Sequence, residues 1–264
     1  MKRIIYTLLI VIIIFMIGCE SKKTVELTPQ EMGSDKEMYE KARKYIRKDP
    51  DKARLLFKEV MQLYPTSIYA KKSKVAIGDS YFKAKDAASL IMAAAEYQEF
   101  VNMFPNSPDA VYAMSQIGMC YFKQMKKPGR DQTNTYGTIK AYQNLIKQYP
   151  DTQEAEDAKK KIAKARQYLA THYFRIGYYN YKYRAPKGAI ARFKQVINEF
   201  PDFEKNDKLF FITGKCYIKI NDLDTALSFF QKVVNSYPKS KYLKKSLKKI
   251  KDINKMKAKK GAQK

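Results

Sequence analysis

A cysteine at the end of an apolar run is the residue with the clearest chemistry in this sequence. A Lys-Arg pair precedes 15 apolar or weakly polar residues, Ile4 to Gly18, and Cys19 follows directly. As a helix this run reaches roughly 22 Å, which is short of the ~30 Å hydrocarbon core of a bilayer. We therefore expect residues 1–18 to be a signal peptide that is cut after Gly18, and not a stable membrane-spanning helix.

The Gly18-Cys19 junction resembles the lipobox of bacterial lipoproteins. The resemblance implies that a diacylglyceryl thioether forms on the Cys19 sulfur, that the chain is cut after Gly18, and that the freed amine is acylated. Met16 stands where the lipobox usually has Leu. A short uncleaved anchor with an incidental cysteine is the alternative interpretation.

The other reactive side chains form no catalytic or metal-binding pattern in the sequence. His172 is the only histidine, and Cys120 and Cys216 are the only cysteines besides Cys19. A zinc site therefore has little support. The sequence contains no GxSxG, HExxH, phosphate-loop or GxGxxG motif. We expect a protein that is not an enzyme and that holds no cofactor or metal.

The net charge of +26 limits the choice of partners. An exported protein does not meet nucleic acid, so the charge favours anionic lipid head groups or acidic protein surfaces as partners. The chain is also rich in Lys, Ile, Tyr and Asn together, as expected of an AT-rich genome. Codon bias is therefore an alternative source of the charge.

An aromatic residue followed by proline recurs at intervals of 37 to 51 residues. The five pairs are Tyr64-Pro65, Phe104-Pro105, Tyr149-Pro150, Phe200-Pro201 and Tyr237-Pro238. Another aromatic residue lies eight positions before each proline, with apolar residues at spacings of three and four between them. This spacing predicts a helix with one buried stripe. The helix ends at the proline, because the residue before proline is pushed out of the α region.

A second helix is predicted upstream of each of these, and in three of them glycine lies near the middle. Gly78, Gly118 and Gly214 are each followed three residues later by tyrosine. Glycine inside a helix costs about 1 kcal/mol relative to alanine, so its recurrence at one register predicts a close approach of helices. The pattern resembles the tetratricopeptide repeat, a helix-turn-helix unit. The last unit carries Phe210, Gly214, Tyr217, Ala226, Phe230 and Pro238 at the signature positions.

We therefore expect an all-α fold, a tetratricopeptide-repeat solenoid of about five helix-turn-helix units plus a C-terminal capping helix. The first unit is degenerate, with Lys41 in place of glycine, and the turn-rich Lys127–Asp131 segment is the larger of two insertions. The stretch from Thr152 to Tyr183 predicts an unusually long first helix in repeat four. The expected domains are the signal peptide (1–18), a lipidated N-terminus and linker (19–35), an N-terminal arm of repeats one to three (36–150), a C-terminal arm of repeats four and five (151–238), and a Lys-rich capping helix and tail (239–264).

Two further expectations follow from the repeat register. Cys120 and Cys216 occupy equivalent positions two repeats apart, too far for a disulfide. In the capping helix, Leu243, Leu247 and Ile250 are predicted to face the solenoid beneath a solvated lysine face. A role for these lysines at head groups or at an acidic partner is left open.

The lipobox, the five repeats and the particular residues of repeats three and four together resemble the BamD lipoproteins of the outer-membrane β-barrel assembly machinery. The segments that carry the resemblance are Tyr64 to Ala70, Arg130-Asp131-Gln132, Ala141-Tyr142, Tyr149 to Thr152, Leu169-Ala170, and Ala189 with Arg192. Asn180 and Tyr183 depart from it, because the family often has Tyr and Arg there.

The resemblance implies a lipid-anchored scaffold of the outer membrane that faces the periplasm. Its C-terminal repeats would bind the periplasmic domains of the central barrel-inserting subunit, and its N-terminal repeats would receive the C-terminal targeting strand of unfolded outer-membrane proteins. Arg192, Tyr69 and Arg130 are the implied partner-binding residues, with an exposed helix arginine as the alternative reading of Arg192. Glu20 is not the Asp that retains some lipoproteins in the inner membrane, so outer-membrane delivery is expected.

The competing interpretation is another periplasmic tetratricopeptide lipoprotein scaffold, in cell-envelope or division complexes. An enzyme would need a further catalytic domain, for which the repeats leave no room. A strand that ends in an aromatic residue and a carboxylate would suit an aromatic groove rimmed with lysine. The abundance of Tyr and Phe makes such a groove possible on the walls formed by the first helices.

Overall fold

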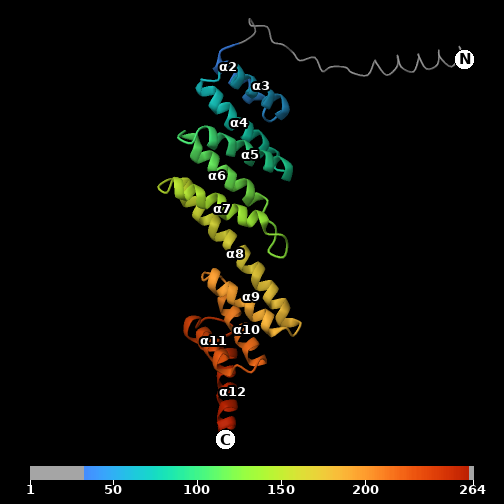
Figure 1. Cartoon of the computed structure of the whole chain (residues 1–264), viewed down its shortest axis with the longest axis vertical. Helices are drawn as coiled ribbons and strands as arrows, with labels where there is room; N and C mark the ends of the chain where they lie inside the picture. The colour runs from blue at the N-terminus through green and yellow to red at the C-terminus, as the bar shows by residue number, and fades with distance from the viewer. Residues whose placement is uncertain (1–32, 262–264) are drawn as a thin grey trace, which may run out of the picture.

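The computed structural model describes residues 33–261 and shows a stack of α-helices with no strand in that range (Figure 1). The helices are α2 Asp35–Tyr45, α3 Pro50–Leu63, α4 Ile68–Ala84, α5 Ala87–Met103, α6 Asp109–Lys123, α7 Thr133–Gln148, α8 Gln153–Lys182, α9 Pro186–Glu199, α10 Asn206–Lys219, α11 Leu223–Ser236 and α12 Leu243–Gly261. Neighbours in the sequence pack as neighbours in space. Within the described residues α2 to α11 form five pairs and α12 closes the stack, so the predicted all-α solenoid is confirmed. In each pair the first helix has the even number and the second helix the odd number.

The second helices begin and end at the residues that the sequence marks. The carboxylates of Asp49, Asp86 and Asp222 accept hydrogen bonds at 2.9–3.0 Å from the backbone N–H three residues later, which caps α3, α5 and α11. Every second helix ends immediately before the aromatic residue of an aromatic-proline pair. The turn signals therefore fix the length of these helices locally.

The glycines of the first helices lie directly against the aromatic rings of the second helices. A Cβ placed on Gly78, Gly118, Gly177 or Gly214 would come within 2.5–2.8 Å of the ring of Tyr97, Tyr142, Phe193 or Phe230, respectively. All four rings are almost completely buried. The predicted close approach of helices is confirmed, and it has the same geometry in repeats two to five.

Helix α8 is the long helix that the sequence predicts, with 30 residues between the caps Thr152 and Tyr183. Its first half packs against α7 and its second half against α9. At about 1.5 Å per residue α8 is about 45 Å long, whereas the 16 residues of α7 reach only about 24 Å. Helix α7 is therefore too short to cover the whole of α8.

The capping helix α12 corrects one expectation. Leu247, predicted to face the solenoid, is 49% exposed, whereas Ser246 and Ile253 are fully buried. The aligned position in α10 is Phe210, whose ring packs against Phe229 of the second helix in the same repeat. No described helix follows α12, so nothing covers Leu247.

Both described cysteines are free thiols and are fully buried. Cys120 lies on α6 and Cys216 on α10, as the repeat register predicts. Burial raises the pKa of the Cys120 thiol to about 12 and that of the Cys216 thiol to about 11. Both side chains therefore act as small apolar residues at neutral pH, with little of the reactive thiolate.

The glycine contacts give a stability test. Gly118→Ala should destabilise the fold by about 1–3 kcal/mol, because its Cβ would overlap the Tyr142 ring. Gly188→Ala is the matched control on the exposed side of α9, where only the end of the Asn180 side chain is near. At position 188 the higher helix propensity of alanine should leave the free energy of unfolding unchanged or raise it by up to about 1 kcal/mol. Urea unfolding followed by circular dichroism measures both; equal midpoints for the two variants would contradict the close-packing account.

Candidate partner-binding site

A continuous stripe of residues runs along one side of α8 at alternating spacings of four and three. Its members are Ala158, Ile162, Ala165, Leu169, His172, Ile176, Tyr179 and Tyr183. The first four lie in the half of the helix that packs on α7, and all but the partly covered Ile162 are buried. The last four lie in the second half, beyond most of α7, and we call these four residues the open face of α8.

The open face corresponds to a surface that is buried in repeats two, three and five. The residues aligned with His172, Ile176 and Tyr179 are Ser73, Ile77 and Ser80 of α4, Ala113, Ile117 and Cys120 of α6, and Leu209, Thr213 and Cys216 of α10, and all nine are buried. In those repeats the preceding second helix covers them. In repeat four Tyr179 is 59% exposed and Tyr183 68% exposed, with their ring centroids 4.3 Å apart. The open face therefore has the spacing of a helix-packing surface, on which His172 and Ile176 are partly covered and Tyr179 and Tyr183 are exposed.

Arg192 lies on α9 beside the open face. Its Cζ is 5.9 Å from the centroid of the Tyr173 ring, and its Nη1 donates a 3.0 Å hydrogen bond to Oε1 of Gln195. The side chain is exposed and forms no ion pair with any residue in the described range. Its guanidinium is thus available to a carboxylate from outside the chain.

Arg130 lies in the α6–α7 loop, which reaches the same part of α8. The ring Nδ1 of His172 lies 2.7 Å from the carbonyl oxygen of Pro128. Because a carbonyl oxygen can only accept a hydrogen bond, Nδ1 carries the proton and donates it. Three loop carbonyls, including that of Arg130, accept hydrogen bonds from the buried Gln132 amide. The loop is therefore held against the N-terminal end of the open face, at His172. Arg130 is an exposed residue of this loop.

A tyrosine pair makes a further contact between α7 and α8 near the open face. The hydroxyls of Tyr136 on α7 and Tyr173 on α8 lie 2.5 Å apart. Partial burial, with the Tyr173 hydrogen bond as a second cause, raises the pKa of Tyr136 to about 12. Tyr136 lies outside the repeat signature, so the sequence gives no signal that marks it.

Tyr69 is not part of this surface. It lies at the start of α4, in the first inter-repeat turn, where its ring packs 5.4 Å from that of Tyr39. Cys19 lies outside the described residues. Of the predicted site residues, the structure therefore brings Arg192 and the Arg130 loop to one region and leaves Tyr69 near the other end of the stack (Figure 1).

An open groove between α8 and α10 lies on the opposite side of the open face from Arg192. It encloses about 380 Å³ and is lined by Thr171, Phe174, Arg175, Tyr178, Tyr179, Lys182, Lys205 and Lys208. The Lys208 ammonium is 5.0 Å from the Tyr178 ring centroid and 5.5 Å from that of Phe174. None of the lining residues is acidic. We call this the α8–α10 groove; it is aromatic, rimmed with cations, and formed by first helices alone.

The N-terminal arm has different chemistry. The Asp79 carboxylate accepts hydrogen bonds from the hydroxyls of Tyr97, at 2.6 Å, and Tyr112, at 2.8 Å. Burial, together with the Asp79 charge, raises the pKa of both tyrosines above its ordinary value. The contact region of α4, α5 and α6 thus presents the Asp79 carboxylate, and its Lys74 ammonium is paired with Glu96 and Glu99.

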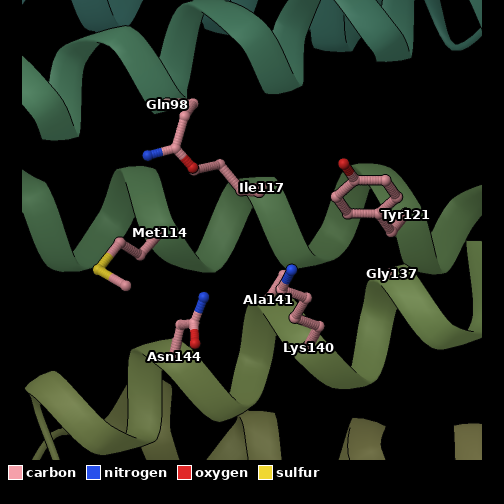
Figure 2. A pocket seen from close by; sticks show the side chains of 8 residues that line it. All are labelled: Gln98, Met114, Ile117, Tyr121, Gly137, Lys140, Ala141 and Asn144. Carbon is pink, nitrogen blue, oxygen red and sulfur yellow. The ribbon is translucent and has the colours of Figure 1, made fainter.

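Figure 2 shows a smaller hollow of about 250 Å³ in that arm, with α6 at its floor and α5 and α7 as its walls. Its lining comprises Gln98, Met114, Ile117, Tyr121, Gly137, Lys140, Ala141 and Asn144. These side chains offer two amides and one ammonium but no nucleophile paired with a base. Across the described part of the chain, no three His, Cys, Asp or Glu residues gather as a metal site requires, and no helix is long and apolar enough to cross a bilayer.

Comparisons with known proteins agree with this architecture. A family model described as outer membrane lipoprotein, YfiO, matches residues 31–221, and a tetratricopeptide repeat model matches residues 209–240. The outer membrane protein assembly factor BamD of Caulobacter vibrioides is 29% identical over 164 residues, which cover 62% of this chain and 53% of that protein. BamD of Haemophilus influenzae is 21% identical over 248 residues, which cover 89% of this chain and 91% of that protein.

The solved TPR2AB domain of yeast Sti1 in complex with pHSP90 has a TM-score of 0.42 and 12% identity, covering 77% of this chain and 78% of that one. The chain spans about half the length of the Caulobacter relative. The stacked helix pairs define the class of the molecule, a tetratricopeptide-repeat protein. Because the YfiO match covers most of the chain, the chain belongs to that family of outer membrane lipoproteins. The chain is also similar to the BamD assembly factors.

Proposed function

We propose that this protein is an outer-membrane lipoprotein scaffold of β-barrel assembly, anchored through Cys19 and facing the periplasm. In this proposal the C-terminal arm, residues 151–238, binds the periplasmic domains of the central barrel-inserting subunit. The observation that supports it best is the open face of α8 beside the unpaired Arg192.

The chemistry of the open face fits a protein partner. Tyr179 and Tyr183 give a large, stiff contact area at low conformational cost, and tyrosine and arginine are the residues that most often dominate binding energy at interfaces. A partner that lies along the open face takes the place of the second helix that covers the aligned residues in the other repeats. Arg192 then pairs with a partner carboxylate beside the open face, and the Arg130 loop borders the N-terminal end of that face.

The substrate contact is a separate part of the proposal. A targeting strand that ends in an aromatic side chain and a free carboxylate matches the α8–α10 groove, where Phe174 and Tyr178 lie beside Lys205 and Lys208. The family resemblance implies the N-terminal repeats for this role. The Asp79 carboxylate there disfavours an anionic strand end, so we favour the α8–α10 groove.

Arg192→Glu tests the partner site. A charge-assisted hydrogen bond from arginine to a carboxylate contributes about 1.5–3 kcal/mol, so the variant should bind the central subunit about tenfold to a hundredfold more weakly. Lys194→Glu, on the same helix and with the same charge change, is the matched control and should bind as the wild type does. Co-purification and titration measure the effect, with circular dichroism to verify folding. Wild-type affinity of Arg192→Glu, or a dominant partner from a division complex, would favour the alternative envelope scaffold.

Lys205→Glu combined with Lys208→Glu tests the groove. The double variant should lose most of its affinity for a short peptide that ends in Phe with a free carboxylate, because two of the four cations that line the groove are reversed in charge. Lys232→Glu combined with Lys239→Glu, on exposed positions of repeat five, is the control pair. Fluorescence anisotropy of the labelled peptide is the measurement. Equal binding of the amidated peptide to the wild type would argue against recognition of a carboxylate.

Cys19→Ala tests the anchor. Acyl chains contribute about 0.8 kcal/mol per buried methylene, so several of them hold a protein on the membrane almost irreversibly. The variant should appear as a soluble or uncleaved precursor of altered mass, whereas Cys120→Ala should fractionate with the outer membrane. Mass spectrometry of the fractionated protein decides. An unchanged mass and membrane location for Cys19→Ala would leave the uncleaved-anchor interpretation.

A further inference from the structure

The turns that join repeat one to repeat two and repeat two to repeat three expose apolar side chains along one edge of the stack. Leu63 is 43% exposed, Ile68 61% and Met103 51%, and Pro108 is also exposed. Ile68, Met103 and Pro108 line one shallow hollow together with the Phe104 turn. We call Leu63, Ile68, Met103 and Pro108 the apolar edge.

The apolar edge is confined to the first two turns. The residues aligned with Leu63 and Met103, just before the aromatic-proline pair, are Gln148, Glu199 and Ser236 in repeats three to five. The residues aligned with Ile68 and Pro108, three positions after the proline of the pair, are Gln153, Glu204 and Lys241. The same backbone turn therefore carries polar or charged side chains in three repeats and apolar ones in two. A general requirement of the fold does not explain this difference, because the later turns form equally well without it.

The chain enters the fold at this edge. The Tyr64 hydroxyl donates a 3.1 Å hydrogen bond to the carbonyl oxygen of Gly33, the first described residue, and the Ser67 hydroxyl bonds to the Asp35 carboxylate. Tyr64 and Ser67 belong to the turn that carries Leu63 and Ile68. Thirteen residues lie between Cys19 and Gly33, so the two residues are at most about 50 Å apart along the extended chain. An anchor on Cys19 is therefore tethered to the end of the stack that carries the apolar edge.

We propose that the apolar edge of repeats one and two rests on the membrane surface, in the interfacial layer of the bilayer that holds the lipid anchor. This inference rests on the proposed lipidation of Cys19. The anchor keeps the edge close to the bilayer, so a small apolar area suffices for contact, as a second weak signal does for singly acylated proteins. The contact sets the orientation of the N-terminal arm, because the four residues lie in two successive inter-repeat turns. The other exposed large aliphatic residues of this arm, Leu55, Ile91 and Met92, lie within α3 and α5, away from these turns.

The charges near the edge are mixed. Lys71 lies in the hollow, with its ammonium 5.4 Å from the Phe104 ring centroid, and the exposed Lys72 follows it. Asp109 also lines the hollow. The apolar side chains, rather than attraction between the protein and anionic lipid, therefore provide the contact, and it should form on neutral and anionic vesicles alike.

The absence of tryptophan from the sequence allows a direct test. Ile68→Trp and Met103→Trp each place a single fluorophore on the apolar edge, and Gln148→Trp places one at the aligned position of repeat three. Residues 19–264 of each variant are coupled through Cys19 to a maleimide phospholipid in phosphatidylcholine vesicles, with and without brominated acyl chains. Cys19→Ser versions, which leave only the buried thiols, control for the site of coupling. Chemical coupling makes the test independent of lipidation in the cell and of any protein partner.

We expect a blue-shifted emission and strong quenching by brominated lipid at positions 68 and 103, and no quenching at position 148. Circular dichroism verifies that each variant is folded. Equal quenching at all three positions, or none at 68 and 103, would overturn the inference without touching the scaffold proposal. Two other results would also overturn it. If the tryptophans at positions 68 and 103 are already shielded from aqueous iodide before coupling, residues 20–32 cover the edge. If these tryptophans become shielded only when the central subunit is added, the edge binds that protein and not the membrane.

Discussion

The contact between a backbone glycine and an aromatic ring is the constraint on which the solenoid depends. In repeats two to five the glycine of the first helix leaves room for one ring of the second helix, and a single Cβ would close that room. The ring in turn fills the space between the two helices and is almost completely buried. Because the contact recurs with the same geometry, each pair presents the same outer surface to the next pair, and the pairs can stack. Close packing at one atom of each repeat thus determines how repeats two to five are built.

The place where this regular stacking is interrupted is also the place that offers a binding surface. Helix α8 is about twice as long as α7, so the stripe from Ala158 to Tyr183 extends beyond the end of α7, which covers its first half. The remaining half keeps the spacing of a packing surface but carries two exposed tyrosines instead of small buried residues. Around it lie Arg192, the Arg130 loop and the cations of the α8–α10 groove. A single change of helix length therefore produces the most distinctive surface of the C-terminal arm.

The proposed roles of the N-terminal arm and the C-terminal arm differ. The N-terminal arm carries the apolar edge where the chain enters the fold, next to the residues that lead to Cys19. The C-terminal arm carries the open face and the α8–α10 groove. In the middle of α8, Arg166 donates a hydrogen bond to the carbonyl oxygen of Glu199 at the end of α9, and Gln167 hydrogen-bonds to the backbone of Asp202 and Glu204 in the α9–α10 turn. Because α8 joins the two arms, we expect it to set the distance between the proposed partner surface and the proposed membrane contact.

The sequence by itself determined the features that depend on neighbouring residues along the chain. The aromatic-proline pairs predicted where the second helices end, Gly78, Gly118 and Gly214 predicted the close helix contacts, and the stretch from Thr152 to Tyr183 predicted the long helix. These signals act through local backbone preference and side-chain size, which the sequence states directly. Whether a helix face is covered depends on a different helix and on how far it reaches. Only the tertiary structure could therefore show that Tyr179 and Tyr183 are exposed where aligned residues are buried, that Leu247 faces solvent, and that Leu63, Ile68 and Met103 share an edge with Gly33.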